Sequence, residues 1–333
     1  MVARGGRACQ RFSERISSLA KILKICFHGS KAVRKAVNGD ARGELVSESV
    51  QDRLRAAFPS LTRAERQLAA TITENYPVSG MGTITILARA AGVSTPTVAR
   101  MVQKLGFKGF PEFQEALREE LRAQMTSPLE KHEAWSRGAP AGHMLNRFTD
   151  IALENIRQTL AQVDPAEFDA ATALLSDLER QIFVTGGRIT RTLSTYLEMH
   201  LQVMRPGVRH VQGNASGWSH ALLDMGEGDV LVIYDIRRYQ KALLTLSEMA
   251  RARGVRIVLF TDQWLSPIHP LADHGFAARI EAPSAWDSST ALLLLTETVI
   301  AAVQEVLWDE VTRERMADLE RIFDHTPVFR KLP

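Results

Sequence analysis

The chain has 333 residues, of which 45% are hydrophobic and 24% charged, and a formal net charge of +3 at neutral pH. This length predicts about two domains, and the composition is typical of a soluble globular protein. It argues against a membrane protein, because no apolar run reaches the roughly 20 uncharged residues that a spanning helix needs. The most apolar segment, 288–308, is interrupted by Glu297 and Glu305. We therefore expect a cytoplasmic protein without a membrane partner.

The first 43 residues are strongly basic, with ten lysines and arginines against Glu14 and Asp40. Such a tail is compatible with contact to DNA or a membrane surface, or with a targeting segment. Because residues 1–50 lack sustained periodicity, the simplest interpretation is a basic, disordered extension. Both cysteines, Cys9 and Cys26, lie there, which fits a reducing compartment. No Cys/His cluster has metal-ligand spacing, and we expect neither a metal nor a cofactor.

Residues 51–124 have a helical pattern with the breaks of a small DNA-binding unit. Thr62 and Glu65 have the spacing of a capping box, which opens the first helix. A short second helix ends at Gly92, where a positive φ lets the chain change direction. Ser94 then caps a third helix. This arrangement predicts a helix-turn-helix.

The third helix of this unit is predicted to be amphipathic. Its apolar residues fall at helical spacing and should form the core: Val98, Met101, Val102 and Leu105. The opposite face is hydroxyl and cationic, which suits phosphate oxygens and base edges, and no acid occurs between Asn75 and Pro111. The candidate DNA-binding residues are Arg89, Ser94, Thr95, Thr97, Arg100, Lys104 and Lys108. A three-helix bundle with a solvated basic face is the alternative.

The pattern changes in the C-terminal half. Residues 125–143 contain several glycines and prolines and are predicted to be a linker. Two helices are expected over 145–160 and 165–178, and then short apolar runs alternate with helical segments. The expected strands are Gln181–Thr185, Val208–Gln212, Asp229–Tyr234, Arg256–Thr261 and Phe276–Glu281. This alternation predicts a parallel sheet, so the fold class is α/β, with an all-helical helix-turn-helix domain followed by a parallel-sheet domain over 144–333.

Three segments together resemble a known family. The segments 61–65, 87–100 and 105–113 are similar to the N-terminal domain of the RpiR family of bacterial transcription regulators, and the last contains a Leu-Gly-Phe-Lys-Gly-Phe junction that generic helix-turn-helix domains lack. The resemblance implies a C-terminal sugar isomerase (SIS) domain that binds phosphosugars or other anions. It also implies a double-stranded DNA operator as partner. We expect a homodimer or homotetramer, because palindromic half-sites require two-fold symmetry.

Two loops are candidates for the effector site. In an open parallel sheet, ligands bind beyond the C-terminal strand ends, next to helix N-termini. One loop, 185–190, is rich in glycine, and the other, 235–240, has two adjacent arginines that an anion can bridge. The candidate effector-binding residues are Gly186, Gly187, Arg188, Thr190, Arg191, Asp235, Arg237, Arg238 and Tyr239.

The second loop departs from the family pattern. SIS domains that hold sugar phosphates carry a Ser-x-Ser-Gly-x-Thr/Ser loop here, whereas residues 234–239 contain neither serine nor glycine. The arginines favour a carboxylate or another planar anion, which a guanidinium binds with two hydrogen bonds. The alternative is structural: Asp235 pairs with Arg237 or Arg238 in an ion-pair network.

The competing function is a SIS-fold sugar-phosphate isomerase or a related enzyme. Isomerisation requires a general base beside the substrate, and the loop acids Asp235, Asp262 and Asp287 have no distinguishing context. A DNA-binding domain would also be unexplained in such an enzyme. We therefore predict a transcription regulator that responds to a small anionic metabolite (a phosphosugar or an organic acid), is not an enzyme and has no catalytic residues.

Overall fold

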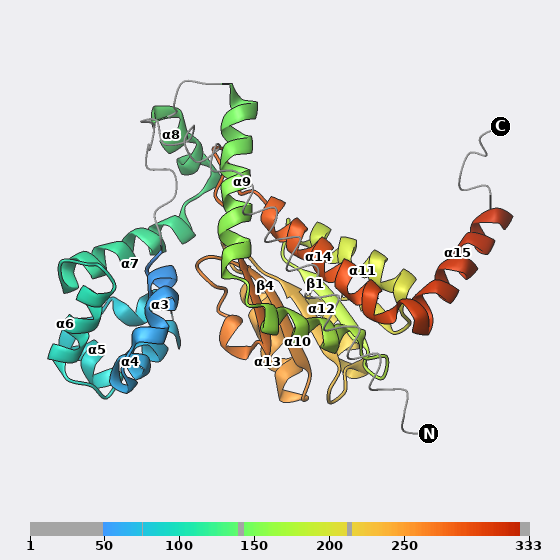
Figure 1. Cartoon of the computed structure of the whole chain (residues 1–333), viewed down its shortest axis with the longest axis horizontal. Helices are drawn as coiled ribbons and strands as arrows, with labels where there is room; N and C mark the ends of the chain where they lie inside the picture. Colours follow the sequence, from blue (N-terminus) through green and yellow to red (C-terminus); the bar gives the residue numbers. More distant parts are fainter. Residues whose placement is uncertain (1–48, 75, 139–142, 212–214, 327–333) are drawn as a thin grey trace. The chain divides into compact units, whose positions relative to one another are not determined.

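The computed structural model describes residues 49–333, except 75, 139–142, 212–214 and 327–333. The predicted basic extension lies outside the described residues, apart from positions 49 and 50, and so do both cysteines. The described chain folds into a helical N-terminal domain and a C-terminal α/β domain, as predicted (Figure 1).

The N-terminal domain is built from short helices whose predicted ends are confirmed. The described α-helices are α3 (Val50–Ala57), α4 (Arg63–Glu74), α5 (Ile84–Ala90), α6 (Thr95–Lys104) and α7 (Phe110–Met125). In the capping box of α4, the Thr62 amide donates to Glu65 Oε2 at 2.8 Å and the Glu65 amide to Thr62 Oγ1 at 3.3 Å. Gly92 has a φ of 63°, and the Thr97 amide donates to Ser94 Oγ at 3.4 Å. Helices α5 and α6 therefore form the expected helix-turn-helix.

The core of this domain is formed by the predicted apolar faces. The side chains of Val98, Met101, Val102 and Leu105 are all at most 4% exposed. They belong to one buried cluster with residues of α4, among them Leu68 and Ile72. Burying one face of α6 leaves its hydroxyl and cationic face outward, which is what positions the candidate DNA surface.

The segment predicted as a linker contains a helix, α8 (Pro128–Gly138). Its start is a second capping box, because the Ser127 amide donates to Glu130 Oε2 at 2.7 Å and the Glu130 amide donates to Ser127 Oγ at 3.2 Å. Pro128 occupies the first helical position, where its missing N–H costs nothing. The connection between the two domains is therefore ordered next to α7 rather than irregular.

The C-terminal domain has a five-stranded parallel sheet in the order β2-β1-β3-β4-β5. The strands are β1 (Ile182–Gly186), β2 (Val208–His210), β3 (Val230–Tyr234), β4 (Arg256–Asp262) and β5 (His274–Ala278). The last strand lies closer to the N-terminus than predicted. The reason is that the Ile280 amide, which we expected in the strand, donates to the Gln263 side chain at 3.2 Å instead of to a neighbouring strand.

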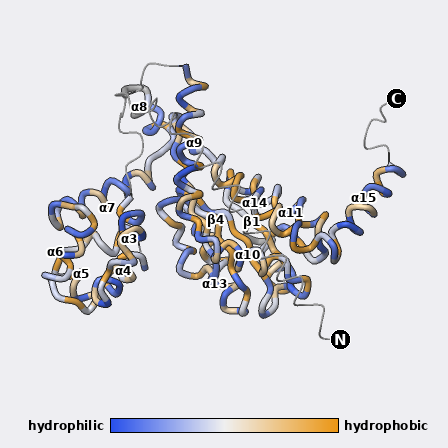
Figure 2. Tube along the Cα trace, viewed as in Figure 1, coloured by the Kyte–Doolittle hydropathy of each residue, from blue (hydrophilic) through white to orange (hydrophobic). Residues whose placement is uncertain are grey.

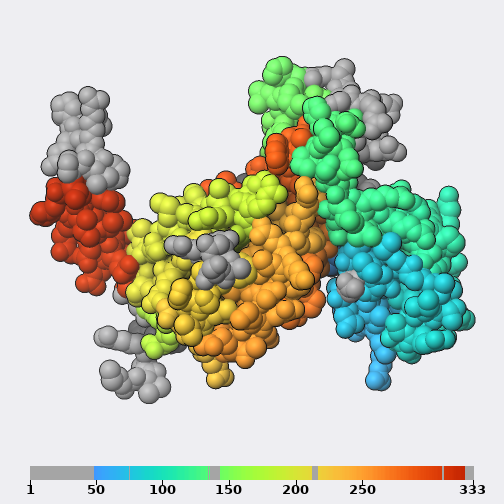
Figure 3. All heavy atoms as spheres, turned by 180° about the vertical axis from the view of Figure 1, so that it is seen from behind, coloured from blue at the N-terminus to red at the C-terminus, as the bar shows by residue number. Residues whose placement is uncertain are grey.

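Helices cover both faces of this sheet. They are α9 (Met144–Gln162), α10 (Pro165–Ser176), α11 (Arg191–Met204), α12 (Ala215–Asp224), α13 (Lys241–Ala252) and α14 (Thr290–Leu307). The last helix, α15 (Arg313–His325), packs against α11 and not against the sheet (Figure 1). Side chains alternate along β3: Val232 and Tyr234 join a core with α10, α11 and α14, whereas Leu231 and Ile233 join a core with α12 and α13. Figure 2 shows the hydrophobic residues concentrated along the strands, and Figure 3 shows the yellow and orange atoms of the domain packed into one continuous body.

Among the described helices, α14 alone is long and apolar enough to cross a membrane by length and composition. Its residues Leu292, Val299 and Val303 are buried in the larger core of the α/β domain. In this structure α14 is the core helix that the sequence predicted.

The strand order places a topological switch point between β1 and β3. The helix that follows β1, α11, packs on one face of the sheet, and the helix that follows β3, α13, packs on the other. The C-terminal ends of the two strands are paired, Gly186 with Tyr234. A crevice opens beyond the strands at such a point, and ligands bind there in open parallel sheets. Both predicted effector loops leave the sheet at this position.

Candidate functional site

The outer face of α6 and its approaches carry the predicted DNA-binding residues. The exposed candidates are Arg89, Ser94, Thr95, Arg100, Lys104 and Lys108, and Thr97 is half-buried. Ser94 Oγ and Thr97 Oγ1 lie 2.9 Å apart and share a hydrogen bond at the start of the helix. Within the described residues, no hydrogen bond or ion pair holds the Arg100 side chain. This face therefore offers one mobile guanidinium beside two hydroxyl groups.

Lys104 is a predicted DNA-binding residue whose side chain is engaged within the protein. Its Nζ lies 2.8 Å from Glu65 Oε2 and donates to the Ser60 carbonyl oxygen at 3.0 Å. The hydrogen bond from Lys104 lowers the pKa of the Glu65 carboxyl. Lys104 is thus less available to a phosphate than Arg100 is.

The two predicted effector loops meet at one open cavity of about 820 Å³ beyond β1 and β3. Six of the nine candidates line it: Gly187, Arg188, Thr190, Asp235, Arg237 and Arg238. The other three, Gly186, Arg191 and Tyr239, do not line it. The remaining wall comes from Ile189, Ile236, Gln240, Ala285, Trp286, Asp287 and Ser289, and from Thr126 and Pro128 at the junction of α7 and α8.

Gly186 and Thr190 build the floor of the cavity. A Cβ atom at Gly186 would lie 2.8 Å from the Thr190 carbonyl oxygen and 2.9 Å from the Arg191 amide, so only glycine fits where β1 turns into α11. Thr190 is buried, and its Oγ1 donates to the Tyr234 carbonyl oxygen at 2.9 Å. The close approach at Gly186 is therefore made to the protein backbone.

Asp235 is buried and holds the loop after β3 in place. Ser266 Oγ donates to Asp235 Oδ2 at 2.6 Å, and the Gln240 amide, at the start of α13, donates to Oδ1 at 3.3 Å. Burial raises the pKa of Asp235 to about 6. Among the residues that the structure describes, Asp235 makes no ion pair with Arg237 or Arg238, so the network that we considered as an alternative has a different acid.

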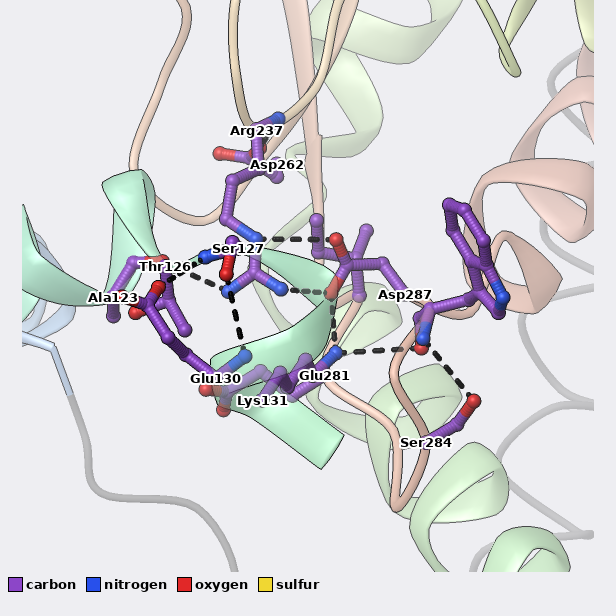
Figure 4. A network of polar contacts seen from close by, with 12 residues as sticks. Ala123, Thr126, Ser127, Glu130, Lys131, Arg237, Asp262, Glu281, Ser284 and Asp287 are labelled. Carbon is purple, nitrogen blue, oxygen red and sulfur yellow. Dashed lines mark hydrogen bonds and ion pairs between the residues drawn. The ribbon is translucent and has the colours of Figure 1, made fainter. Parts of the chain in front are cut away.

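That acid is Asp287, and its partner is Arg237. Arg237 Nε lies 3.1 Å from Asp287 Oδ2 and Nη2 lies 2.5 Å from Oδ1, while Nη1 donates to the Ala123 carbonyl oxygen at 2.9 Å (Figure 4). The guanidinium also lies over the ring of buried Trp264, 5.3 Å from its centroid. Only 6% of the Arg237 side chain is exposed.

Arg238 has a different environment from its neighbour. It is exposed at the cavity and has a φ of 65°, in the left-handed region that non-glycine residues rarely adopt. Backbone strain of this kind concentrates at binding sites, where the surrounding structure enforces it. The two adjacent arginines therefore do not form one clamp: Arg237 is held by Asp287, whereas Arg238 is exposed at the cavity near Glu130.

Lys131 of α8 also reaches this wall. Its Nζ lies 2.6 Å from Asp287 Oδ1 and 3.3 Å from the Trp286 carbonyl oxygen. Sequence reasoning missed Lys131 because its acid is 156 residues away. The Ser127–Glu130 capping box was a signal that α8 exists, but nothing in the sequence placed that helix against the cavity.

The comparisons with known proteins agree with the two domains. Residues 48–124 match the helix-turn-helix domain of the rpiR family, and residues 175–302 match the SIS domain. The chain belongs to the RpiR family. This RpiR-type regulator is 24% identical to the regulator HexR of Pseudomonas aeruginosa over 289 residues, which are 82% of this chain and 91% of HexR. It is also 24% identical to a helix-turn-helix-type transcriptional regulator of Clostridium perfringens over 218 residues, which are 64% of this chain and 75% of that protein.

The chain is also similar to solved structures of two regulators. NanR of Vibrio vulnificus, complexed with ManNAc-6P, has a TM-score of 0.47 and 18% identity, covering 85% of this RpiR-type chain and 100% of NanR. The sugar isomerase domain of an RpiR transcription factor from Sphaerobacter thermophilus has a TM-score of 0.46 and 23% identity, covering 54% of this chain and 97% of that one.

In this RpiR-type chain, the loop after β3 lacks the serines of the family pattern and carries a buried carboxylate, Asp235. Its carboxylate already accepts the Gln240 amide at the start of α13. A helix N-terminus attracts anions through its free N–H groups and its dipole. Here part of that attraction is satisfied by a side chain of the protein itself.

Proposed function

We propose that this RpiR-type regulator binds its operator through the outer face of α6, and that a small anionic metabolite in the cavity beyond β1 and β3 sets its affinity for DNA. The observation that carries the proposal is that Thr126 and Pro128, which directly follow the helix-turn-helix domain, form part of the wall of the cavity. A ligand in the cavity therefore touches the connection to the DNA-binding domain.

The DNA half of the proposal rests on Arg100 and on the hydroxyl groups at the start of α6. Arg100 is long enough for a bidentate contact with guanine, and Ser94 and Thr95 suit phosphate oxygens. The first turn of α6 contains no acidic residue that would repel the backbone of DNA. Because one short helix reads few base pairs, we propose that a cytoplasmic homodimer or homotetramer presents two such helices to a palindromic operator.

The effector half rests on the arginines at the cavity. Arg188 and Arg238 are exposed there, and the neighbouring carboxylate of Glu130 interacts with Arg238 electrostatically. Asp235 fills the start of α13, so a phosphate group at this helix would meet a buried carboxyl. We therefore favour an organic acid, whose planar carboxylate matches a guanidinium, over a sugar phosphate.

The loop acids support a binding protein rather than an isomerase. Asp262 is fully buried and accepts the Tyr239 hydroxyl at 2.7 Å and the Trp264 amide at 3.0 Å. Asp235 and Asp287 are engaged as well, by Ser266 and by Arg237. Because these carboxylates already accept hydrogen bonds from the protein, a structural role fits them better than that of a general base facing the substrate.

The proposal is tested by DNA selection with the full chain, followed by operator titration. Fluorescence anisotropy would measure operator affinity alone and with gluconate, citrate, pyruvate, glucose 6-phosphate and ManNAc-6P. We expect an organic acid to change the affinity by about 5- to 150-fold, the range of allosteric coupling. The test variant for DNA binding is Arg100→Ala on α6, and the matched control is Arg209→Ala on the exposed surface of the α/β domain. If no compound changes the operator affinity, the proposal about the effector is wrong. If Arg100→Ala selects the same DNA sequences as the wild type, the proposal about DNA binding is wrong.

A further inference from the structure

We propose that Asp287 occupies the place of a carboxylate of the effector. When the effector binds, its carboxylate replaces Asp287 on Arg237, and this exchange releases Arg237 from the last turn of α7. The inference rests on the proposed function and adds to it the class of ligand, the group that it binds and the contact that it breaks.

The first step is the geometry of the pair. Arg237 donates from Nε and Nη2 to the two oxygens of Asp287, which is the two-point arrangement that a guanidinium makes with any carboxylate. Both residues line the cavity. An incoming carboxylate would therefore find a receptor of the right shape that is already occupied by a group of its own chemistry.

The second step is accessibility. The Arg237 and Lys131 side chains are 6% and 9% exposed, whereas that of Asp287 is 20% exposed. The acid is thus the most open member of the cluster. It lies in the irregular segment 282–289, beside Trp286, whose side chain is 56% exposed. Displacing Asp287 requires a rearrangement of this segment only, without melting a helix or a strand.

The third step is what the arginine holds besides Asp287. Arg237 Nη1 donates to the Ala123 carbonyl oxygen at 2.9 Å, and Ala123 lies in the last turn of α7 (Figure 4). The two bonds to Asp287 fix the plane of the guanidinium, and this plane directs Nη1 at Ala123. The ligand binds from the open cavity and not from the position of Asp287, so the guanidinium plane turns toward it and the bond to α7 is lost.

The fourth step is energetic. The exchange replaces one arginine–carboxylate pair by another, so it is close to neutral by itself. The equilibrium between the two arrangements of Arg237 then depends on the other contacts of the ligand, which Arg188 and Arg238 can provide. A ligand shifts a conformational equilibrium only through such differential contacts. Effectors should therefore carry a carboxylate and at least one further polar or anionic group.

The test uses Asp287→Asn in the full chain, with Asp224→Asn as the matched control. Asp224 forms an exposed ion pair with Arg209, and neither residue lines the cavity. Without any ligand, we expect Asp287→Asn and Arg237→Gln to shift operator affinity in the direction in which the effector shifts the wild type, by about 5-fold or more. Asp224→Asn should match the wild type. Circular dichroism would verify that all variants are folded, and Asp287→Glu should restore part of the wild-type behaviour.

Direct binding gives a second readout that a purely structural ion pair would not produce. Among gluconate, citrate and pyruvate, the compound that binds the wild type most tightly should bind Asp287→Asn more tightly and Arg237→Gln more weakly, measured by calorimetry. Weaker or unchanged binding to Asp287→Asn overturns the inference, as does tight binding of sugar phosphates alone. A wild type whose operator affinity responds to no compound overturns the proposed function. A responsive wild type whose Asp287→Asn variant behaves identically overturns only the exchange.

Discussion

Glu65 on α4 and Lys104 on α6 form an ion pair of 2.8 Å that ties the recognition helix to the first helix of the motif. The same Glu65 carboxylate closes the capping box with Thr62. Its side chain is 9% exposed and that of Lys104 is 35% exposed, so the pair lies at the edge of the domain core. The two cations of α6 thus differ in their surroundings: Lys104 is paired with Glu65, whereas Arg100 is exposed, and we propose that Arg100 contacts DNA.

Replacing Arg100 by Ala should remove sequence preference. A lost bidentate contact with a base costs about 1–3 kcal/mol and relaxes specificity at one position of the operator. DNA selection with wild type and Arg100→Ala would measure this change. A variant that selects the same sequences with the same affinity would show that Arg100 does not face the bases.

Replacing Lys104 by Ala should act mainly on stability. The ion pair is partly exposed, so we expect a loss of about 1 kcal/mol or less in the free energy of unfolding. The slope of operator affinity against salt concentration should change little, because the amine is already neutralised by Glu65. A slope that falls by about one would instead show that Lys104 contacts a phosphate, as first predicted from the sequence.

Replacing Asp235 by Ser should open the start of α13 to phosphate. The Gln240 amide would lose its internal acceptor, and a hydroxyl would take the place of the carboxyl. Favourable charge at a helix N-terminus contributes up to about 2 kcal/mol, so we expect affinity for glucose 6-phosphate to rise by about tenfold or more. Calorimetry with wild type and Asp224→Ser as references would measure it. Unchanged affinity would mean that Asp235 does not exclude phosphate.

Glu120 should make the stability of the DNA-binding domain depend on pH. Its carboxyl accepts the Val50 amide at 2.7 Å and the Tyr76 hydroxyl, and burial raises its pKa from 4.5 to about 7. A raised pKa means that the folded state prefers the protonated acid. This contribution is therefore complete below about pH 4.5 and is lost as the pH rises through 7.

Glu120→Gln should remove this dependence. The glutamine amide keeps an acceptor for Val50 and offers a donor to Tyr76. Between about pH 5 and pH 8, the free energy of unfolding should therefore fall less in the variant than in the wild type. The difference should reach up to about 3 kcal/mol. Thermal unfolding at several pH values would measure the difference. The exposed neighbour Glu119, changed to Gln, is the control, and parallel curves for wild type and Glu120→Gln would contradict the prediction.

Arg205 should be one of the most sensitive positions of the α/β domain. It is 1% exposed, and its guanidinium donates to the carbonyl oxygens of Leu175 at 2.6 Å, Asp177 at 2.9 Å and Pro206 at 3.1 Å, and to that of Arg180. Arg205→Met would remove these hydrogen bonds and leave the buried Leu175 carbonyl without its guanidinium donor, while the Asp177 carbonyl keeps the Arg180 amide. We expect a cost of about 3 kcal/mol. Arg209→Met, which breaks only an exposed pair, should cost about 1 kcal/mol or less in chemical denaturation. Similar costs for both variants would contradict this reasoning.

The elements that the sequence predicted well are those with strong local signals. The strand at Val230–Tyr234 is apolar throughout, as a strand covered on both faces must be, and Ser94 and Gly92 mark the ends of helices through their own chemistry. Helix α8 was taken for a linker because Pro128 and Gly138 were interpreted as breaks, although they stand at its two ends.

The candidate site was predicted in position but not in its pairings. Both loops lie at the strand ends, because the carboxyl ends of parallel strands meet at one edge. The structural alternative paired nearby Asp235 with Arg237 or Arg238, whereas the fold brings Arg237 to Asp287, 50 residues away. Ion pairs over such distances depend on how segments pack, and a single sequence contains no local signal for that.

Thr126 and Pro128 form part of the wall of the cavity, and this has a consequence for pharmacology. Two compounds with the same acidic group should change operator affinity differently if only one of them is long enough to contact this wall. We expect length in this direction, rather than affinity, to separate molecules that trigger the regulator from molecules that merely block it.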